Sequence, residues 1–156
     1  QMGLFTKKEK TEKMLMIHYE GIPNYKGGLV THMTLDEDDK CLKFKSPVLK
    51  DLPEVKLPFA KINKAGLVNV TEIEEQSKLG RAAVGGLLFG GAGAIVGALS
   101  AGEKKKIKSL YIINYMSNGE EKAIVMKENG NLNFFKFQKH LQELLPKEDF
   151  PKNISL

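Results

Sequence analysis

A run of 20 consecutive residues without a charge, Ala82–Ala101, constrains the fold more than any other feature. It reads AAVGGLLFGGAGAIVGALSA and contains six glycines within 20 residues. A helix of that length would be about 30 Å long, which is the thickness of the hydrocarbon core of a bilayer. Each glycine in an exposed helix costs up to about 1 kcal/mol relative to alanine. A helix here therefore needs close packing, against protein or lipid, to offset that cost.

Small residues recur on one side of this predicted helix, at steps of three or four positions. They are Ala82, Gly86, Gly90, Gly93, Gly97 and Ala101. A face without large side chains lets a second helix approach closely, as in GxxxG contacts. We therefore predict that these six residues form a glycine-zipper-like face for helix packing.

Seven other segments have the alternation or the β-branched composition of strands. They are residues 14–19, 29–35, 41–45, 56–62, 66–74, 107–116 and 121–127. Asn118-Gly119 predicts a type I′ turn between the last two strands. The helical spacing of apolar residues then predicts one amphipathic helix that ends before Pro146 and docks on a sheet. Its apolar positions are Phe134, Phe137, Leu141, Leu144 and Leu145.

This order of elements is typical of an α+β fold, and it resembles the pleckstrin-homology-like (PH-like) superfold in its bacterial or GRAM-like version. The matching parts are the hairpin Leu29–Phe44, the segment Leu57–Ile62 leading into Leu67–Val70, the hairpin Leu110–Met126 and the helix Phe134–Leu145. The resemblance implies an antiparallel seven-stranded sandwich or partly open barrel closed by the C-terminal helix. It also implies a module that binds lipids or proteins and is not an enzyme.

Three regions follow from this division of the chain. Residues 1–13 form a charged N-terminal segment, residues 14–146 the PH-like domain and residues 147–156 a C-terminal tail. The glycine-rich insertion occupies about residues 77–104, between the fifth and sixth strands. A single membrane pass there would separate strands that must share one core. We therefore expect a helical hairpin that folds back near Gly90-Gly91, or a segment that lies in the membrane interface.

Basic residues flank the insertion on both sides, as contact with anionic headgroups requires. They are Lys78, Arg81, Lys104, Lys105, Lys106 and Lys108. We predict that these six residues contact an anionic surface. Two alternatives stay open: the insertion packs on its own domain or on a second copy, or it is only a linker.

The overall composition is that of a globular protein, with 42% hydrophobic and 28% charged residues. This excludes disordered, collagen-like and polytopic membrane chains. The net charge is +5, but Arg81 is the only arginine and tryptophan is absent, which disfavours sequence-specific nucleic-acid binding. The single cysteine, Cys41, predicts an intracellular protein, and the lysines at positions 7, 8, 10 and 13 predict that no signal peptide is present.

Catalytic and ligand-binding signatures fail at specific residues. Val96 breaks the GxGxxG spacing, and Glu103 stands where a phosphate-binding loop needs lysine. Cys41 and Pro47 occupy the positions at which a calcium loop beginning at Asp36 needs glycine and glutamate. The three histidines, His18, His32 and His140, show no metal-ligand spacing. We predict no catalytic residue, metal site or cofactor.

The sequence thus predicts a non-enzymatic, PH-like binding module whose insertion mediates self-association or membrane-surface contact. The expected partners are a second copy or another protein, together with an anionic membrane surface. The expected location is the cytoplasm, including the inner face of the membrane. The alternatives are a small ligand-binding protein or enzyme with a pocket near Cys41, and a lysine-rich, non-specific nucleic-acid binder.

Overall fold

The main sheet of the protein has seven antiparallel strands in the order β4-β3-β2-β1-β9-β8-β5. The computed structural model describes residues 11–147. The strands are β1 (Thr11–Glu20), β2 (Leu29–Asp36), β3 (Cys41–Lys45), β4 (Val55–Pro58), β5 (Ile62–Asn69), β8 (Ser109–Ser117) and β9 (Glu120–Glu128). β4 and β5 remain at the two edges, so the sheet is open and not a closed barrel. The predicted α+β fold with a C-terminal helix, α4 (Phe134–Leu144), is confirmed.

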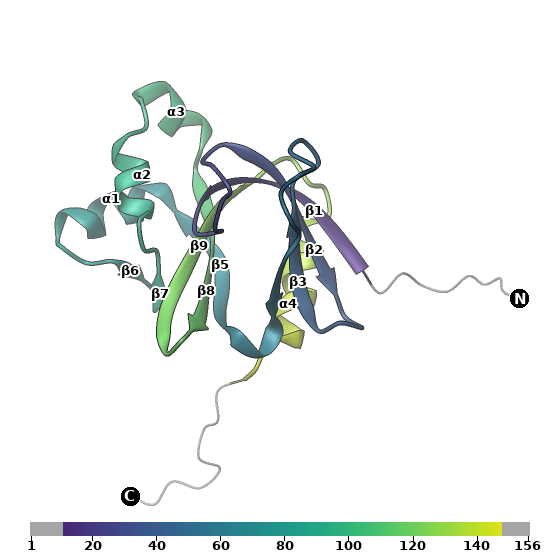
Figure 1. Cartoon of the computed structure of the whole chain (residues 1–156). Helices are drawn as coiled ribbons and strands as arrows, with labels where there is room; N and C mark the ends of the chain where they lie inside the picture. The colour runs from purple at the N-terminus through teal and green to yellow at the C-terminus, as the bar shows by residue number, and fades with distance from the viewer. Residues whose placement is uncertain (1–10, 148–156) are drawn as a thin grey trace, which may run out of the picture.

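The strands pack on each other and on α4 through one face of the sheet (Figure 1). Along β2, Thr31, Met33 and Leu35 alternate with partly exposed residues, as a strand with one buried face requires. α4 contributes Phe134, Phe137 and Leu141, and Leu145, the residue that caps its C-terminus, adds to them. We call this cluster the inner core; its other members include Met14, Met16, Met33, Leu35, Leu42, Phe44, Tyr111, Ile113 and Met126.

The turn between β8 and β9 forms as the sequence predicts. Asn118 and Gly119 both have positive φ, of 52° and 80°, which is the geometry of a type I′ turn. Ser117 pairs with Glu120 directly across it.

The fifth strand is shorter than its composition predicts. We expected a strand over 66–74, but β5 ends at Asn69 and α1 (Val70–Lys78) follows. The side chain of Asn69 accepts a hydrogen bond from the Thr71 amide at 2.8 Å and so caps the helix. The prediction was wrong because Val70, Thr71 and Ile73 are β-branched, and the cap outweighs that local preference.

The insertion between β5 and β8 is a layer of short elements on the outer side of the sheet (Figure 1). After α1 come β6 (Ala83–Val84), β7 (Leu87–Leu88), α2 (Ala92–Gly97) and α3 (Ala101–Lys106). Its two ends meet: Asn69 pairs with Ser109, and the Val70 amide donates to the Lys108 carbonyl at 2.9 Å. The insertion therefore leaves and rejoins the sheet at one rung of the β5–β8 ladder.

A second hydrophobic cluster, which we call the outer core, lies between the insertion and the sheet. The sheet contributes Val68, Leu110, Ile112 and Val125, and the insertion contributes Val70, Ile73, Leu87, Phe89, Ala92, Val96 and Ile107. Consecutive residues of β8, from Leu110 to Asn114, are consequently buried on both faces of the sheet.

The predicted terminal segments fall largely outside the part of the chain that the structure describes. Of the N-terminal segment 1–13, residues 1–10 lie outside it, and residues 11–13 belong to β1. Of the tail 147–156, only Lys147 is described.

Candidate binding surface at the insertion

The first half of the glycine-rich run is a β-hairpin. Gly85 and Gly86 form its turn with φ of 57° and 80°, which glycine adopts without strain. The buried carboxamide of Asn114 on β8 holds the hairpin against the sheet: it accepts from the Leu88 amide at 2.8 Å and donates to the Leu88 carbonyl at 2.6 Å. Lys64 donates to the Gly85 carbonyl at 3.0 Å.

The continuous helix or helical hairpin predicted for this run is therefore wrong. A turn at Gly90-Gly91 joins β7 to α2, and Gly90 has a positive φ of 51° that a helix does not allow. Only the second half of the run is helical. The six residues predicted to share one packing face lie on separate elements: Ala82 before β6, Gly86 and Gly90 in turns, Gly93 and Gly97 in α2, and Ala101 at the start of α3.

Close backbone approach does occur at individual glycines. A Cβ atom on Gly93 would overlap the hydroxyl of Ser77, so this glycine lets α2 lie directly against α1. A Cβ on Gly91, which the predicted face did not include, would overlap the Glu20 carboxylate, and one on Gly90 would lie 3.2 Å from the Ala123 Cβ. At Gly97 it would meet no described atom within 4 Å. The glycines thus serve contacts within the chain at three positions.

α3 is a short helix that ends in three lysines. Ser100 and Glu103 form a capping box: the Ser100 hydroxyl accepts from the Glu103 amide at 3.1 Å, and the Glu103 carboxylate accepts from the Ser100 amide at 2.9 Å. The hydrogen bond that the Glu103 carboxylate accepts from the Ser100 amide, together with the Ser100 side chain, lowers the pKa of Glu103. Lys104 forms an ion pair with Glu74 on α1, and this lowers the pKa of Glu74. α3 is therefore fixed to α1.

Four of the six basic residues predicted to contact an anionic surface gather around the junction of α3 and β8. Lys104, Lys105 and Lys108 line a groove beside the start of α1. Lys106 and Lys108 line a second groove, together with Lys127. Lys105, Lys106 and Lys108 are exposed and form no ion pair with another described residue.

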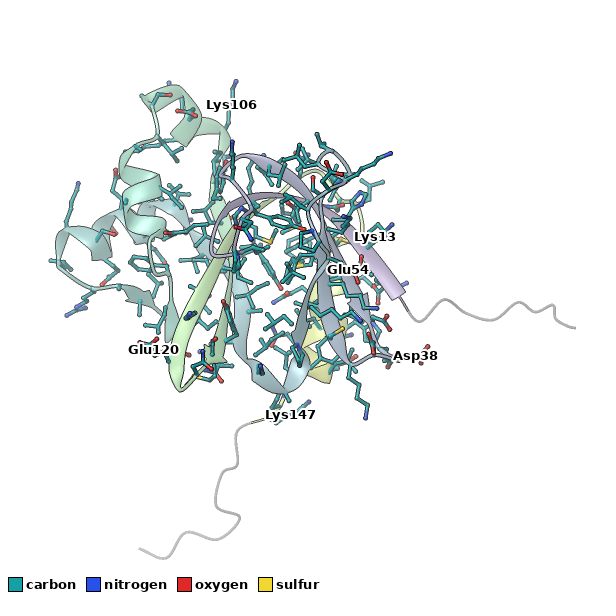
Figure 2. The ribbon with its side chains drawn as sticks, in the orientation of Figure 1. Lys13, Asp38, Glu54, Lys106, Glu120 and Lys147 are labelled. Atoms are coloured by element: carbon teal, nitrogen blue, oxygen red, sulfur yellow. The ribbon has the colours of Figure 1, made fainter. Side chains whose placement is uncertain are left out.

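The other two predicted basic residues lie elsewhere. Lys78 ends α1, and Arg81 follows it, where its guanidinium lies 3.5 Å from the Gln76 side-chain oxygen. Lys106 lies at the end of the molecule where α3 stands, opposite the end that carries Glu120 and Lys147 (Figure 2). The structure therefore concentrates Lys104–Lys108 in one region and leaves Lys78 and Arg81 beyond the far end of α1.

Exposed apolar side chains adjoin these lysines, and the sequence analysis missed them. Phe135 lines the second groove and is 76% exposed, and Leu132, just before α4, is 99% exposed. Phe135 meets Phe134 edge-on, with ring centroids 5.6 Å apart. The sequence could have predicted that Phe135 is exposed, because it falls outside the apolar stripe of Phe134, Phe137 and Leu141.

The geometry does not bring Cys41 and the histidines together. Cys41 pairs with Asp36, whereas His32 lies four residues earlier on β2, about 13 Å away along the strand. The His18 ring lies 3.0 Å from the Lys26 carbonyl and accepts from the Ile22 amide at 3.1 Å, so it closes the β1–β2 loop. Burial lowers the pKa of His18 and raises the pKa of the Cys41 thiol. Between residues 11 and 147, no group of three or more His, Cys, Asp or Glu side chains is arranged to hold a metal ion.

Comparisons with known proteins place the chain within one family. Residues 23–136 match the model of a glycine zipper containing PH domain. No curated protein and no solved structure matches the chain. None of the helices within residues 11–147 has the length and apolar character needed to cross a membrane.

Proposed function

The chain belongs to the family of glycine zipper containing PH domains, and on that premise we propose that it is a binding module that docks on anionic membrane surfaces. Domains of the PH-like superfold are generally non-enzymatic binding modules. The docking surface is the α3–β8 junction, and the location that follows is the inner face of the cytoplasmic membrane. The observation that carries the proposal is the set of three exposed lysines, Lys105, Lys106 and Lys108, without ion-pair partners among the described residues.

A lysine cluster of this kind suits a lipid surface better than a base-reading site. The lysine ammonium is a compact point charge that pairs with phosphate without fixed orientation, whereas nucleic-acid readout favours the planar arginine fork. Each lysine near an anionic leaflet contributes about fivefold to binding. Lys104 contributes less than its neighbours because Glu74 already neutralises it.

The insertion supports this surface by holding α3 in place. α1 packs on the outer core through Val70 and Ile73, and Gly93 allows α2 to lie against α1. The Glu74–Lys104 ion pair then links α1 to α3. In this proposal Gly90 and Gly93 of the predicted packing face allow close packing within the chain, and the exposed lysines bind the lipid headgroups.

The test is sedimentation of the full chain with phosphatidylcholine vesicles that contain graded amounts of phosphatidylserine. Replacing Lys105, Lys106 and Lys108 with Gln should weaken binding about 100-fold at low salt. The matched control replaces Lys61, Lys122 and Lys147, which are exposed, and it should weaken binding far less. Lys147 lies at the end of the molecule opposite Lys106 (Figure 2), and the residues next to Lys61 and Lys122, Ala60 and Glu121, line one groove with it. Equal loss in both triple variants would show that net charge alone governs binding and would contradict the proposed surface.

Self-association is the second candidate function, and one observation favours it. Ala94, Gly97 and Ala98 are exposed on α2, and a Cβ at Gly97 would meet no described atom within 4 Å. A helix of a second copy therefore has room to approach there. Size-exclusion chromatography with light scattering tests this, because Gly97→Leu should dissociate an oligomer formed through α2. A monomer at all concentrations for the native chain would exclude this candidate.

A further inference from the structure

Two neighbouring apolar side chains extend from the surface where β9 passes into α4. Leu132 is 99% exposed and Phe135 is 76% exposed. Leu132 lies in the turn that leads into α4, and Phe135 lies in the first turn of that helix, three positions further along the chain. An isolated exposed leucine is ordinary, but a leucine and a phenylalanine together leave apolar area that folding has not covered.

Lysines surround this pair. Lys106, Lys108 and Lys127 line the groove that Phe135 also lines, and Lys136 and Lys139 follow on exposed positions of α4. None of these five lysines forms an ion pair with another described residue. The carboxylate of Glu128, in the same groove, instead accepts hydrogen bonds from Asn131. Glu12 and Glu143 line a surface groove with Lys136 and Lys139, so five lysines and three carboxylates lie in these two grooves and the net charge there is positive.

The turn that presents Leu132 is fixed to the sheet. The Asn131 carboxamide accepts from the Leu15 amide at 2.8 Å and donates to the Leu15 carbonyl at 2.7 Å. The Asn129 amide donates to the same carbonyl at 3.2 Å. Because the backbone of this turn is already ordered, binding through these side chains would cost little additional conformational entropy.

We propose that Leu132 and Phe135 enter the interfacial layer of an anionic bilayer while the surrounding lysines bind the phosphates of the headgroups. This inference rests on the proposed function, to which it adds an apolar contact and a second element, α4. Apolar side chains inserted to headgroup depth and basic residues beside them are the two contributions by which proteins bind a membrane interface.

A bilayer fits this surface better than a protein partner does. Two large side chains from each of two copies would bury about 800 Å² in all, below the roughly 1,200 Å² of a stable protein interface. Strand addition along β5 is also hindered nearby, because Gln138 and Gln142 both donate to the Ala65 carbonyl, at 2.8 and 2.7 Å. Neighbouring positive charges repel a second copy but attract anionic lipid.

The chain contains no tryptophan, so a single substitution gives an unambiguous probe. Phe135→Trp should show a blue shift of its fluorescence on mixing with vesicles of phosphatidylcholine and phosphatidylserine, and lipids brominated along the acyl chain should quench it. Met116→Trp, at the far end of β8, is the matched control and should show neither effect. Leu132→Ala with Phe135→Ala should lower vesicle binding about tenfold and increase its sensitivity to salt. Its unfolding midpoint should stay close to that of the native chain.

Each outcome has a defined meaning. If the native chain binds the vesicles but the tryptophan at position 135 keeps its water-exposed emission, the inserted pair is refuted and the lysine surface stands. If the native chain fails to bind anionic vesicles, the proposed function fails and this inference fails with it. A blue shift that appears without vesicles as the protein concentration rises would assign the surface to protein contact and overturn the inference.

Discussion

The inner and outer cores lie on the two faces of one sheet and are built from elements of different length. The inner core contains large side chains such as Phe44, Tyr111 and Phe137, supplied by long strands and by the 11-residue α4. The outer core is covered by α1, a hairpin of two-residue strands and the six-residue helix α2. The outer face is thus covered by short elements, which place only a few large side chains, among them Ile73, Leu87 and Phe89, against the sheet.

The difference explains why the cover is rich in glycine. Short helices and strands bury little side-chain area per residue, so their backbones must lie close to the sheet and to one another. Gly93 permits this against Ser77. A sequence that lacks charge over 20 residues can therefore indicate a tightly apposed layer on a sheet, as well as a membrane segment.

The largest expected effect compares one phenylalanine from each core. Phe137→Ala should destabilise the protein by about 3–5 kcal/mol, because the rigid inner core cannot collapse around the cavity. Phe89→Ala, equally buried in the outer core, should cost clearly less, because the thin cover can shift or open locally. Urea unfolding measures both, and equal losses would show that the two cores are equally rigid.

A second prediction concerns the two glycines of α2. Gly93→Leu should destabilise the protein by about 1–3 kcal/mol, because the side chain overlaps Ser77 and forces α2 away from α1. Gly97→Leu introduces the same side chain into open space and should change stability by less than about 0.5 kcal/mol. Thermal unfolding measures the pair. Similar losses for both variants would mean that close packing at Gly93 is unimportant.

A smaller effect is expected at Asn114, the polar contact between the sheet and its cover. Asn114→Ala removes both hydrogen bonds to the Leu88 backbone and should cost about 1 kcal/mol, because Leu88 is partly exposed and water can replace them. Hydrogen exchange should quicken at the Leu88 amide and stay unchanged at Met33 in the inner core. Uniform acceleration across both cores would indicate global destabilisation instead.

The smallest expected effect is a pH dependence of stability that arises on the inner side of the sheet and not in the insertion. The three histidines lie on β1, β2 and α4, and none lies in the insertion that covers the outer core. A hydrogen bond to Glu12 raises the pKa of His140, so its contribution to stability is complete below about pH 6.5 and is lost as pH rises through the raised pKa. His140→Gln should remove this loss.

The contribution of His18 to stability depends on pH in the opposite direction. Burial lowers its pKa, so its contribution is complete above about pH 6.5 and is lost as pH falls through the lowered pKa. Urea midpoints between pH 5 and pH 8 measure both effects. A pH response confined to hydrogen exchange in α2 would contradict the assignment to the inner side.

The sequence was informative where one periodicity dominates. Met33 and Leu35 alternate with polar neighbours, and Phe134, Phe137 and Leu141 share one helical stripe, so the sheet and α4 were predictable. The end of β5 was not, because a single side-chain cap at Asn69 decides it. In the insertion, glycine allows both helix and turn, and only contacts with Asn114 and Ser77 select between them.

The candidate surface was predictable only in part. Lys104–Lys108 stand out as a charge cluster at the end of the uncharged run. Phe135 becomes meaningful only when the fold brings the start of α4 near the last residue of α3 and the first residue of β8, so that Lys106, Ser109 and Phe135 line one groove. Leu132 becomes meaningful only through its nearly complete exposure.

The closure of the insertion at Asn69 and Ser109 has a consequence for how such chains diversify. Because both ends of residues 70–108 occupy one rung of the ladder, their length can change without altering the register of any sheet strand. The sheet can therefore stay unchanged while the insertion is lengthened, shortened or replaced by another sequence. Any replacement must still shield Val68, Leu110, Ile112 and Val125 from water.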